Sequence, residues 1–173
     1  SIETAKRLLS FLADPDWGVR LAAIRAIGPV DFKPARDLLM KQAVEGEIRA
    51  IRRLAAEMLR EHDAAEYARR LGKLALQFQK EERVAPIQAL GTIGGEESVR
   101  ALERLATATD PLHRAEAVRA LGGLRAGEKA LLRALGDREP LVRLRAADVL
   151  ARIDSDAARD ALLAFAEGAS DGY

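Results

Sequence analysis

The feature that most constrains this 173-residue chain is an internal repeat. A short pattern, an arginine followed by small and apolar residues at helical spacing, occurs as VRLAAIRAIG, IRAIRRLAAE, ERVAPIQALG, HRAEAVRALG and VRLRAADVLA. The arginines that anchor these segments are Arg20, Arg49, Arg83, Arg114 and Arg143. Their spacings of 29, 34, 31 and 29 residues accommodate two short helices and two turns. Each repeat is therefore predicted to be a helical hairpin, with an A helix followed by the arginine-bearing B helix.

The composition favours an all-α fold. Leu, Ala, Arg and Glu dominate and aromatic residues make up 4% of the chain, and the abundant residues lose little side-chain entropy in a helix. Ahead of each anchored segment, apolar residues recur at three- and four-residue spacing, as at Leu8, Leu9 and Leu12. We predict an α-solenoid of about five hairpins in a single domain over residues 1–173. The predicted repeats are approximately 2–28, 31–61, 63–94, 96–123 and 126–153, followed by a terminal helix over 155–167.

Glycine and proline mark the predicted turns. Left-handed glycines that end helices are expected at Gly28, Gly94-Gly95, Gly122-Gly123 and Gly136. Prolines that fit the first turn of a helix, where no amide hydrogen bond is lost, are Pro34, Pro111 and Pro140. This punctuation agrees with the repeat period.

The D-x-x-V-R-x-x-A-x-x-A-L-G cadence, clearest at 14–28, 110–122 and 137–153, resembles HEAT repeats. The resemblance is to the short bacterial type, similar to phycobilisome-lyase HEAT-like proteins. It implies an armadillo-like superhelix whose repeats are linked by hydrogen bonds between acids and arginines. We expect a structural ladder formed by the five anchoring arginines with acids placed four residues before four of them, namely Asp16, Glu45, Asp110 and Glu139.

Residues for catalysis are sparse. The chain has no cysteine, its two histidines, His62 and His113, lie 51 residues apart, and it lacks the His-Glu pair that binds iron in some HEAT-repeat hydroxylases. No H-E-x-x-H, G-x-S-x-G or phosphate-cradling glycine loop occurs. We therefore expect no enzyme activity, no catalytic residues, no metal site and no cofactor.

The predicted function is that of a non-catalytic scaffold or adaptor that binds a protein or peptide along the concave face, which we assign to the B helices, with the A helices convex. The candidate partner-binding residues are Arg25, Arg53, Gln88, Glu116, Arg119, Arg145, Arg152 and Trp17. Trp17, at the start of the first B helix, fits either a cap on the open end of the first repeat or a binding anchor.

Two alternatives remain, a nucleic-acid-binding module and a lyase-like or chaperone-like helper for a cofactor-bearing protein. The 28 basic side chains nearly cancel the 27 acidic ones, which gives a net charge of +1 and disfavours a nucleic-acid partner. No apolar run reaches the roughly 20 residues of a membrane helix, and the first residues lack a signal-peptide pattern. We expect a cytoplasmic monomer without membrane contact.

Overall fold

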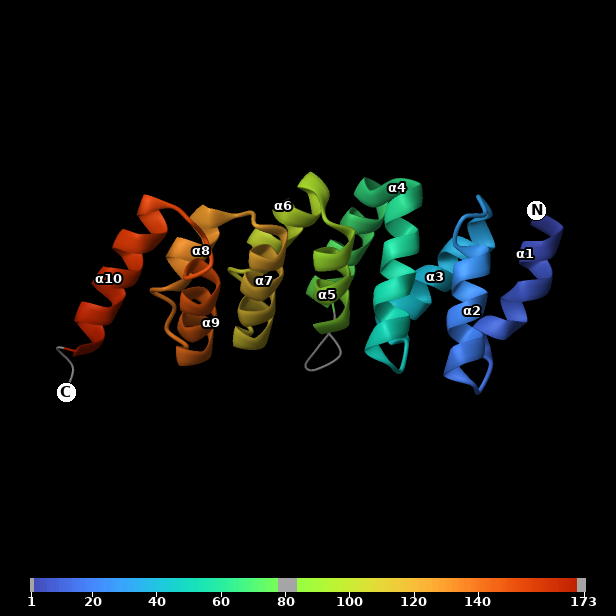
Figure 1. Cartoon of the computed structure of the whole chain (residues 1–173), viewed down its shortest axis with the longest axis horizontal. Helices are drawn as coiled ribbons and strands as arrows, with labels where there is room; N and C mark the ends of the chain where they lie inside the picture. Colours follow the sequence, from blue (N-terminus) through green and yellow to red (C-terminus); the bar gives the residue numbers. More distant parts are fainter. Residues whose placement is uncertain (1, 78–83, 171–173) are drawn as a thin grey trace. The chain divides into compact units, whose positions relative to one another are not determined.

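The computed structural model describes residues 2–77 and 84–170, and every regular element in these ranges is helical (Figure 1). The elements are α1 (Ile2–Leu8), the 3-10 helix η1 (Leu9–Ala13), α2 (Trp17–Ile27), α3 (Lys33–Glu45), α4 (Arg49–Gln77), α5 (Val84–Ile93), α6 (Gly95–Leu105), α7 (Pro111–Leu124), α8 (Glu128–Ala134), α9 (Pro140–Leu150) and α10 (Asp156–Ser170). The predicted fold class, an all-α helical-repeat solenoid, is confirmed.

The chain divides into two compact units, residues 1–98 and residues 99–173. In the first unit α2 packs against η1 and α4, and α3 packs against α4 and α5. The apolar side chains between these helices, among them Leu12, Ile24, Leu39 and Leu59, are fully buried. That both units behave as one cooperative domain stays a prediction.

One residue interrupts α4 and separates the second predicted repeat from the third. Asp63 has a non-helical backbone, with φ −150° and ψ 85°. Its carboxylate accepts a hydrogen bond of 2.9 Å from the backbone N–H of Glu66, as an N-cap side chain does. Asp63 therefore ends one helix and caps the next, with no loop between them.

In the second unit the B helices α7 and α9 pack side by side, α8 packs against both, and α10 packs against α9 (Figure 1). Gly122 sets the approach of α7 to α9, because a Cβ atom at this position would lie 2.5 Å from a Val149 methyl group. Such a distance is far inside van der Waals contact, so only glycine fits without movement of α9. Val118, Leu121, Val142 and Leu150 fill the surrounding core.

The glycine predictions require correction. Gly122 and Gly123 lie inside α7, whose cap residue is Arg125 in the left-handed region (φ 50°), so the turn predicted at the glycine pair is wrong. Gly28 and Gly136 are not left-handed either; Gly28 has φ −46°, and a Cβ there would lie 2.2 Å from the Met58 sulfur. Close packing rather than backbone conformation explains Gly28 and Gly122. Gly94 and Gly95 are left-handed as predicted (φ 69° and 78°).

The proline predictions are confirmed, since the three prolines occupy the first turns of α3, α7 and α9. No helix in the described part of the chain is long and apolar enough to cross a membrane.

Candidate interaction site

Four arginines make the same contact inside their own hairpins. The Nη1 atom of each guanidinium donates to the backbone carbonyls six and five residues earlier, in the turn between the A and B helices. The contacts are Arg20 with Asp14 and Pro15 (2.6 and 3.1 Å), Arg52 with Gly46 and Glu47 (2.7 and 3.4 Å), Arg114 with Ala108 and Thr109 (2.9 and 2.8 Å), and Arg143 with Asp137 and Arg138 (2.9 and 3.1 Å). We call these four residues the arginine ladder; their guanidiniums hold the A–B turns closed.

In the second repeat the ladder position is filled by Arg52, and the prediction of Arg49 is wrong. Arg49 is the exposed first residue of α4, and the associated Glu45 is the last residue of α3, 3.8 Å from Lys41. The dipeptide Ile-Arg occurs at 48–49 and again at 51–52, so the pattern fits in two registers. Burial distinguishes them, because Ile51 is fully buried. Arg83, predicted for the third repeat, lies outside the described residues.

The acids before the ladder arginines act mainly on the backbone. Asp16 accepts hydrogen bonds from the N–H groups of Gly18 and Val19 at 2.6 and 3.3 Å, and Asp110 accepts one from Leu112 at 2.9 Å. Both acids are therefore N-caps of their B helices. Glu139 occupies the N-cap position of α9, but its side chain makes no capping hydrogen bond.

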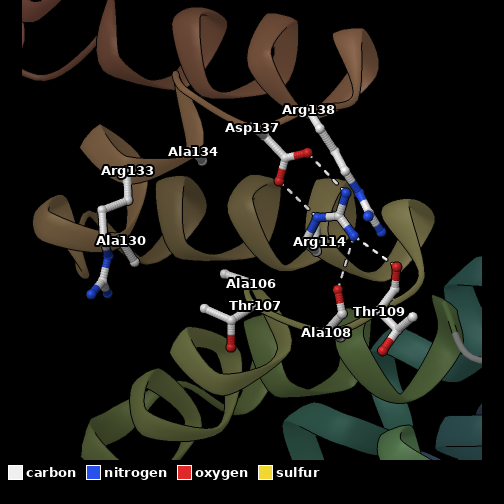
Figure 2. Close-up of a pocket in the computed structure, with 10 residues that line it drawn as sticks. All are labelled: Ala106, Thr107, Ala108, Thr109, Arg114, Ala130, Arg133, Ala134, Asp137 and Arg138. Carbon is white, nitrogen blue, oxygen red and sulfur yellow. Dashed lines mark hydrogen bonds and ion pairs between the residues drawn. The ribbon is translucent and has the colours of Figure 1, made fainter.

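A bidentate ion pair links the fourth hairpin to the fifth (Figure 2). Nε and Nη2 of Arg114 donate to the two carboxylate oxygens of Asp137 at 2.7 and 2.8 Å, and only 6% and 13% of these side chains are exposed. The hydrogen bonds from Arg114 lower the pKa of Asp137, opposed by burial, and the same bonds raise the pKa of Arg114. A hollow of about 500 Å³ lies beside the pair. Asp137 was not among the residues predicted from the sequence, although Asp14 stands at the same position, six residues before its ladder arginine.

Three of the predicted partner-binding residues meet in the second unit. Arg119, Arg145 and Arg152 line one hollow of about 380 Å³ at the C-terminal ends of α7 and α9. Its other lining residues are Gly122, Gly123, Arg125, Asp148, Val149 and Ile153. We call this feature the arginine hollow. Glu116, also predicted, lies beside it and accepts a 2.9 Å hydrogen bond from Arg119.

Helical spacing relative to the ladder arginine explains why these residues lie close together. On each B helix, the residues two positions before, two positions after and five positions after the ladder arginine lie on one face. On α7 these positions hold Leu112, Glu116 and Arg119, and on α9 they hold Leu141, Arg145 and Asp148. Both helices thus begin this face with a leucine and continue it with charged residues. Leu112 and Leu141 are 44% and 42% exposed.

The candidates in the first unit are more scattered. Arg25 is exposed on α2 and Gln88 is half-buried on α5. Arg53 lies one position after the ladder arginine, and Glu57 takes the place that corresponds to Arg119, with 3.5 Å between Glu57 and the Arg53 guanidinium. Trp17, the first residue of α2, is 57% exposed.

The histidines lie apart from these surfaces. His62 contacts the backbone carbonyl of Gly28, and His113 is buried, 3.9 Å from the Asp110 carboxylate. Within the described ranges, no cluster of three or more His, Asp or Glu side chains is placed to hold a metal ion.

Comparison with known proteins shows which family model and which solved structures this chain is similar to. A model of HEAT repeats matches residues 5–83 and 110–173. Human deoxyhypusine hydroxylase in complex with glycerol is a similar solved structure, with 23% identity over 96% of this chain and 68% of that chain and a TM-score of 0.50. An engineered protein is 20% identical over 95% of this chain and 85% of that chain, with a TM-score of 0.49.

A search of curated proteins gives no match. The likeness to the hydroxylase is one of fold alone. The family model covers most of the chain. The chain therefore belongs to the HEAT-repeat family.

Proposed function

We propose that this protein is a non-catalytic scaffold or adaptor that binds a protein or peptide along the exposed face of its B helices. HEAT repeats generally serve as protein-interaction scaffolds, and helical repeats offer extended surfaces without a deep pocket. The observation that carries the proposal is the matched face of α7 and α9, where exposed leucines precede charged side chains at equal positions.

The arginines fall into two groups, one bonded within the fold and one available to a partner, and this supports the proposal. The Nη1 atom of each ladder arginine is engaged with the carbonyls of its A–B turn, so this donor is used within the fold. Arg25, Arg145 and Arg152 project from the same helices or their ends without an ion pair among the described residues. A partner would therefore meet the second group.

The test is an affinity pull-down from native cell extract with two variants of the B-helix face. One carries Arg25→Glu, in the first unit, and the other carries Arg119→Glu with Arg145→Glu, in the second. Arg49→Glu is the matched control, because Arg49 is exposed and a carboxylate is favourable at a helix N-terminus. Circular dichroism must show equal helicity in all variants.

We expect at least one protein that binds wild type and the Arg49→Glu control to be lost from one or both face variants. Retention of every partner by both face variants would refute binding along the B helices. Partners lost equally from the Arg49→Glu control would point to total charge rather than to this face.

A further inference from the structure

We propose that the arginine hollow is the docking site for a short acidic segment of a partner protein, with an apolar side chain of that segment resting on the leucines at the start of α7 and α9. This inference rests on the proposed function and specifies which chemical groups the partner presents.

The arginine hollow carries an excess of positive charge. Four arginines and one acid, Asp148, line the arginine hollow, although the whole chain is nearly neutral with a net charge of +1. Among the described residues, no carboxylate lies within 4.0 Å of the guanidiniums of Arg125, Arg145 and Arg152. Arg119 alone is paired, with Glu116. The arginines outnumber the acids beside them, and like charges in excess repel one another, so acidic side chains entering the hollow would relieve that repulsion.

One arginine of the hollow has an unsatisfied hydrogen-bond donor. The Nε atom of Arg145 is buried and has no hydrogen-bond partner in the described part of the chain. A carboxylate that draws this guanidinium into a charge-assisted, two-point contact would satisfy such a group. Arg114 with Asp137 shows this arrangement elsewhere in the same unit, at 2.7 and 2.8 Å.

Exposed leucines form an apolar end of the same face. Leu141 and Leu144, on the first turns of α9, are 42% and 61% exposed, and Leu112 is 44% exposed at the corresponding end of α7. The rise of a helix puts about 14 Å between Leu141 and Leu150, the last residue of α9, and Arg152 lies two residues beyond. An extended peptide of about five residues spans this length. The matching ligand therefore has one large apolar residue and several acids within about five residues.

A peptide fits this face better than a nucleic acid does. Glu116 and Asp148 stand among the arginines, and they would repel a backbone that carries a negative charge at every nucleotide. A peptide can place a neutral or basic residue opposite each of these two acids while its own acids contact the arginines.

The experiment measures fluorescence anisotropy with the full chain and three fluorescein-labelled probes. The probes are a peptide with one leucine and four glutamates, the same peptide with glutamines in place of glutamates, and a twelve-nucleotide oligothymidylate. The test variant is Arg145→Glu with Arg152→Glu, and the control is Arg49→Glu. A second variant, Arg145→Gln with Arg152→Gln, removes the charge without reversing it, and circular dichroism checks the fold of each.

We expect the glutamate peptide to bind wild type and control equally, and at least tenfold more weakly to the test variant. The glutamine variant should fall between them, and the glutamine peptide should bind wild type at least tenfold more weakly than the glutamate peptide. Equal binding of the two peptides, or of wild type and test variant, would overturn the proposal. Tighter binding of the oligothymidylate, lost in the same variant, would overturn it in favour of nucleic acid.

The pull-down separates this inference from the proposed function. If Arg25→Glu removes a partner while the glutamate peptide does not bind, the scaffold function stands and the acidic ligand is refuted. If no face variant loses a partner and the peptide does not bind, both are refuted.

Discussion

The two units use the same ladder but join their hairpins with different strength. In the first unit the Arg20 guanidinium donates one hydrogen bond of 3.0 Å to Glu47 of the next hairpin, and 81% of the Glu47 side chain is exposed. In the second unit Arg114 holds Asp137 by two contacts, and 13% of the Asp137 side chain is exposed. Water therefore screens the first pair more than the second.

The residue six positions before the next ladder arginine accounts for this difference. In the fifth repeat that residue is Asp137, and in the second repeat it is Gly46. A Cβ at residue 46 would lie 2.6 Å from the carbonyl oxygen of Gln42, so an aspartate does not fit there. The neighbouring Glu47 supplies the carboxylate from solvent instead. The contact of the ladder arginine with its own turn is thus the same in both repeats, while the ion pair that links one hairpin to the next differs.

The largest effect is expected for Arg114→Ala. It leaves the mostly buried Asp137 carboxylate without its ion-pair partner, with the backbone N–H of Glu139 as a remaining donor, and also removes the donor to the turn at 108–109. The free energy of unfolding should fall by about 4 kcal/mol, the range for one-sided loss of a buried pair. Urea denaturation measures it. A loss below about 1 kcal/mol would mean that the link contributes no more than a surface pair.

Gly122→Ala tests the close packing of α7 on α9. The added methyl group would lie 2.5 Å from Val149 and should destabilise the protein by about 2 kcal/mol, as overpacking does. Gly123→Ala is the control, because a Cβ there meets nothing within 4 Å and helix propensity improves by roughly 0.5–1 kcal/mol. Thermal melting compares the two, and restoration of the Gly122→Ala variant by Val149→Ala would localise the clash. Equal melting of both alanine variants would contradict the steric reading.

Arg20→Ala should have a smaller effect than Arg114→Ala. Its hydrogen bonds to Asp14 and Pro15 are lost, but Glu47 returns to solvent without penalty. We expect a loss of about 1.5 kcal/mol in urea denaturation, mostly from the charged donor to the turn. If Glu47→Gln alone reproduced this loss, the exposed pair would be stronger than its geometry implies.

The stability that the Asp137 carboxylate contributes should decrease at low pH. The pKa of Asp137 is lowered in the folded protein from its ordinary value of 3.8. Its contribution to stability is therefore complete above that value and is lost as the pH falls through the folded pKa. The stability difference between wild type and Asp137→Asn, measured by urea midpoints from pH 6 to pH 2.5, should shrink below pH 4. A constant difference would show that Asp137 acts through packing rather than through charge.

The comparison also shows what the sequence could and could not predict. The repeat period and the first-turn prolines indicated the helical hairpins, because both depend on local spacing. The register of the second repeat was wrong because Ile-Arg occurs twice within one turn, and only tertiary burial selects Ile51 and Arg52. The glycine pair at 122–123 was misassigned because a glycine needed for helix contact is indistinguishable in sequence from one needed for a turn.

The candidate site was predictable in part for similar reasons. The spacing along the B helices led to Arg119 on α7 and Arg145 on α9, which hold corresponding exposed faces, and to Arg152 just beyond the end of α9; the three line one hollow. Arg125 was missed because it ends α7 with a left-handed backbone, which no helical pattern anticipates. Glu57 was missed through the register error that selected Arg53.

The junction at Asp63 bears on how such an array can be rebuilt. Protein engineers lengthen, shorten or permute repeat arrays by cutting between hairpins, where spare loop residues absorb the change. At this junction a single residue both ends one helix and caps the next through Glu66, so it holds no spare residues. Any new end or inserted hairpin must come with its own cap. The second and third repeats are therefore best handled as one module.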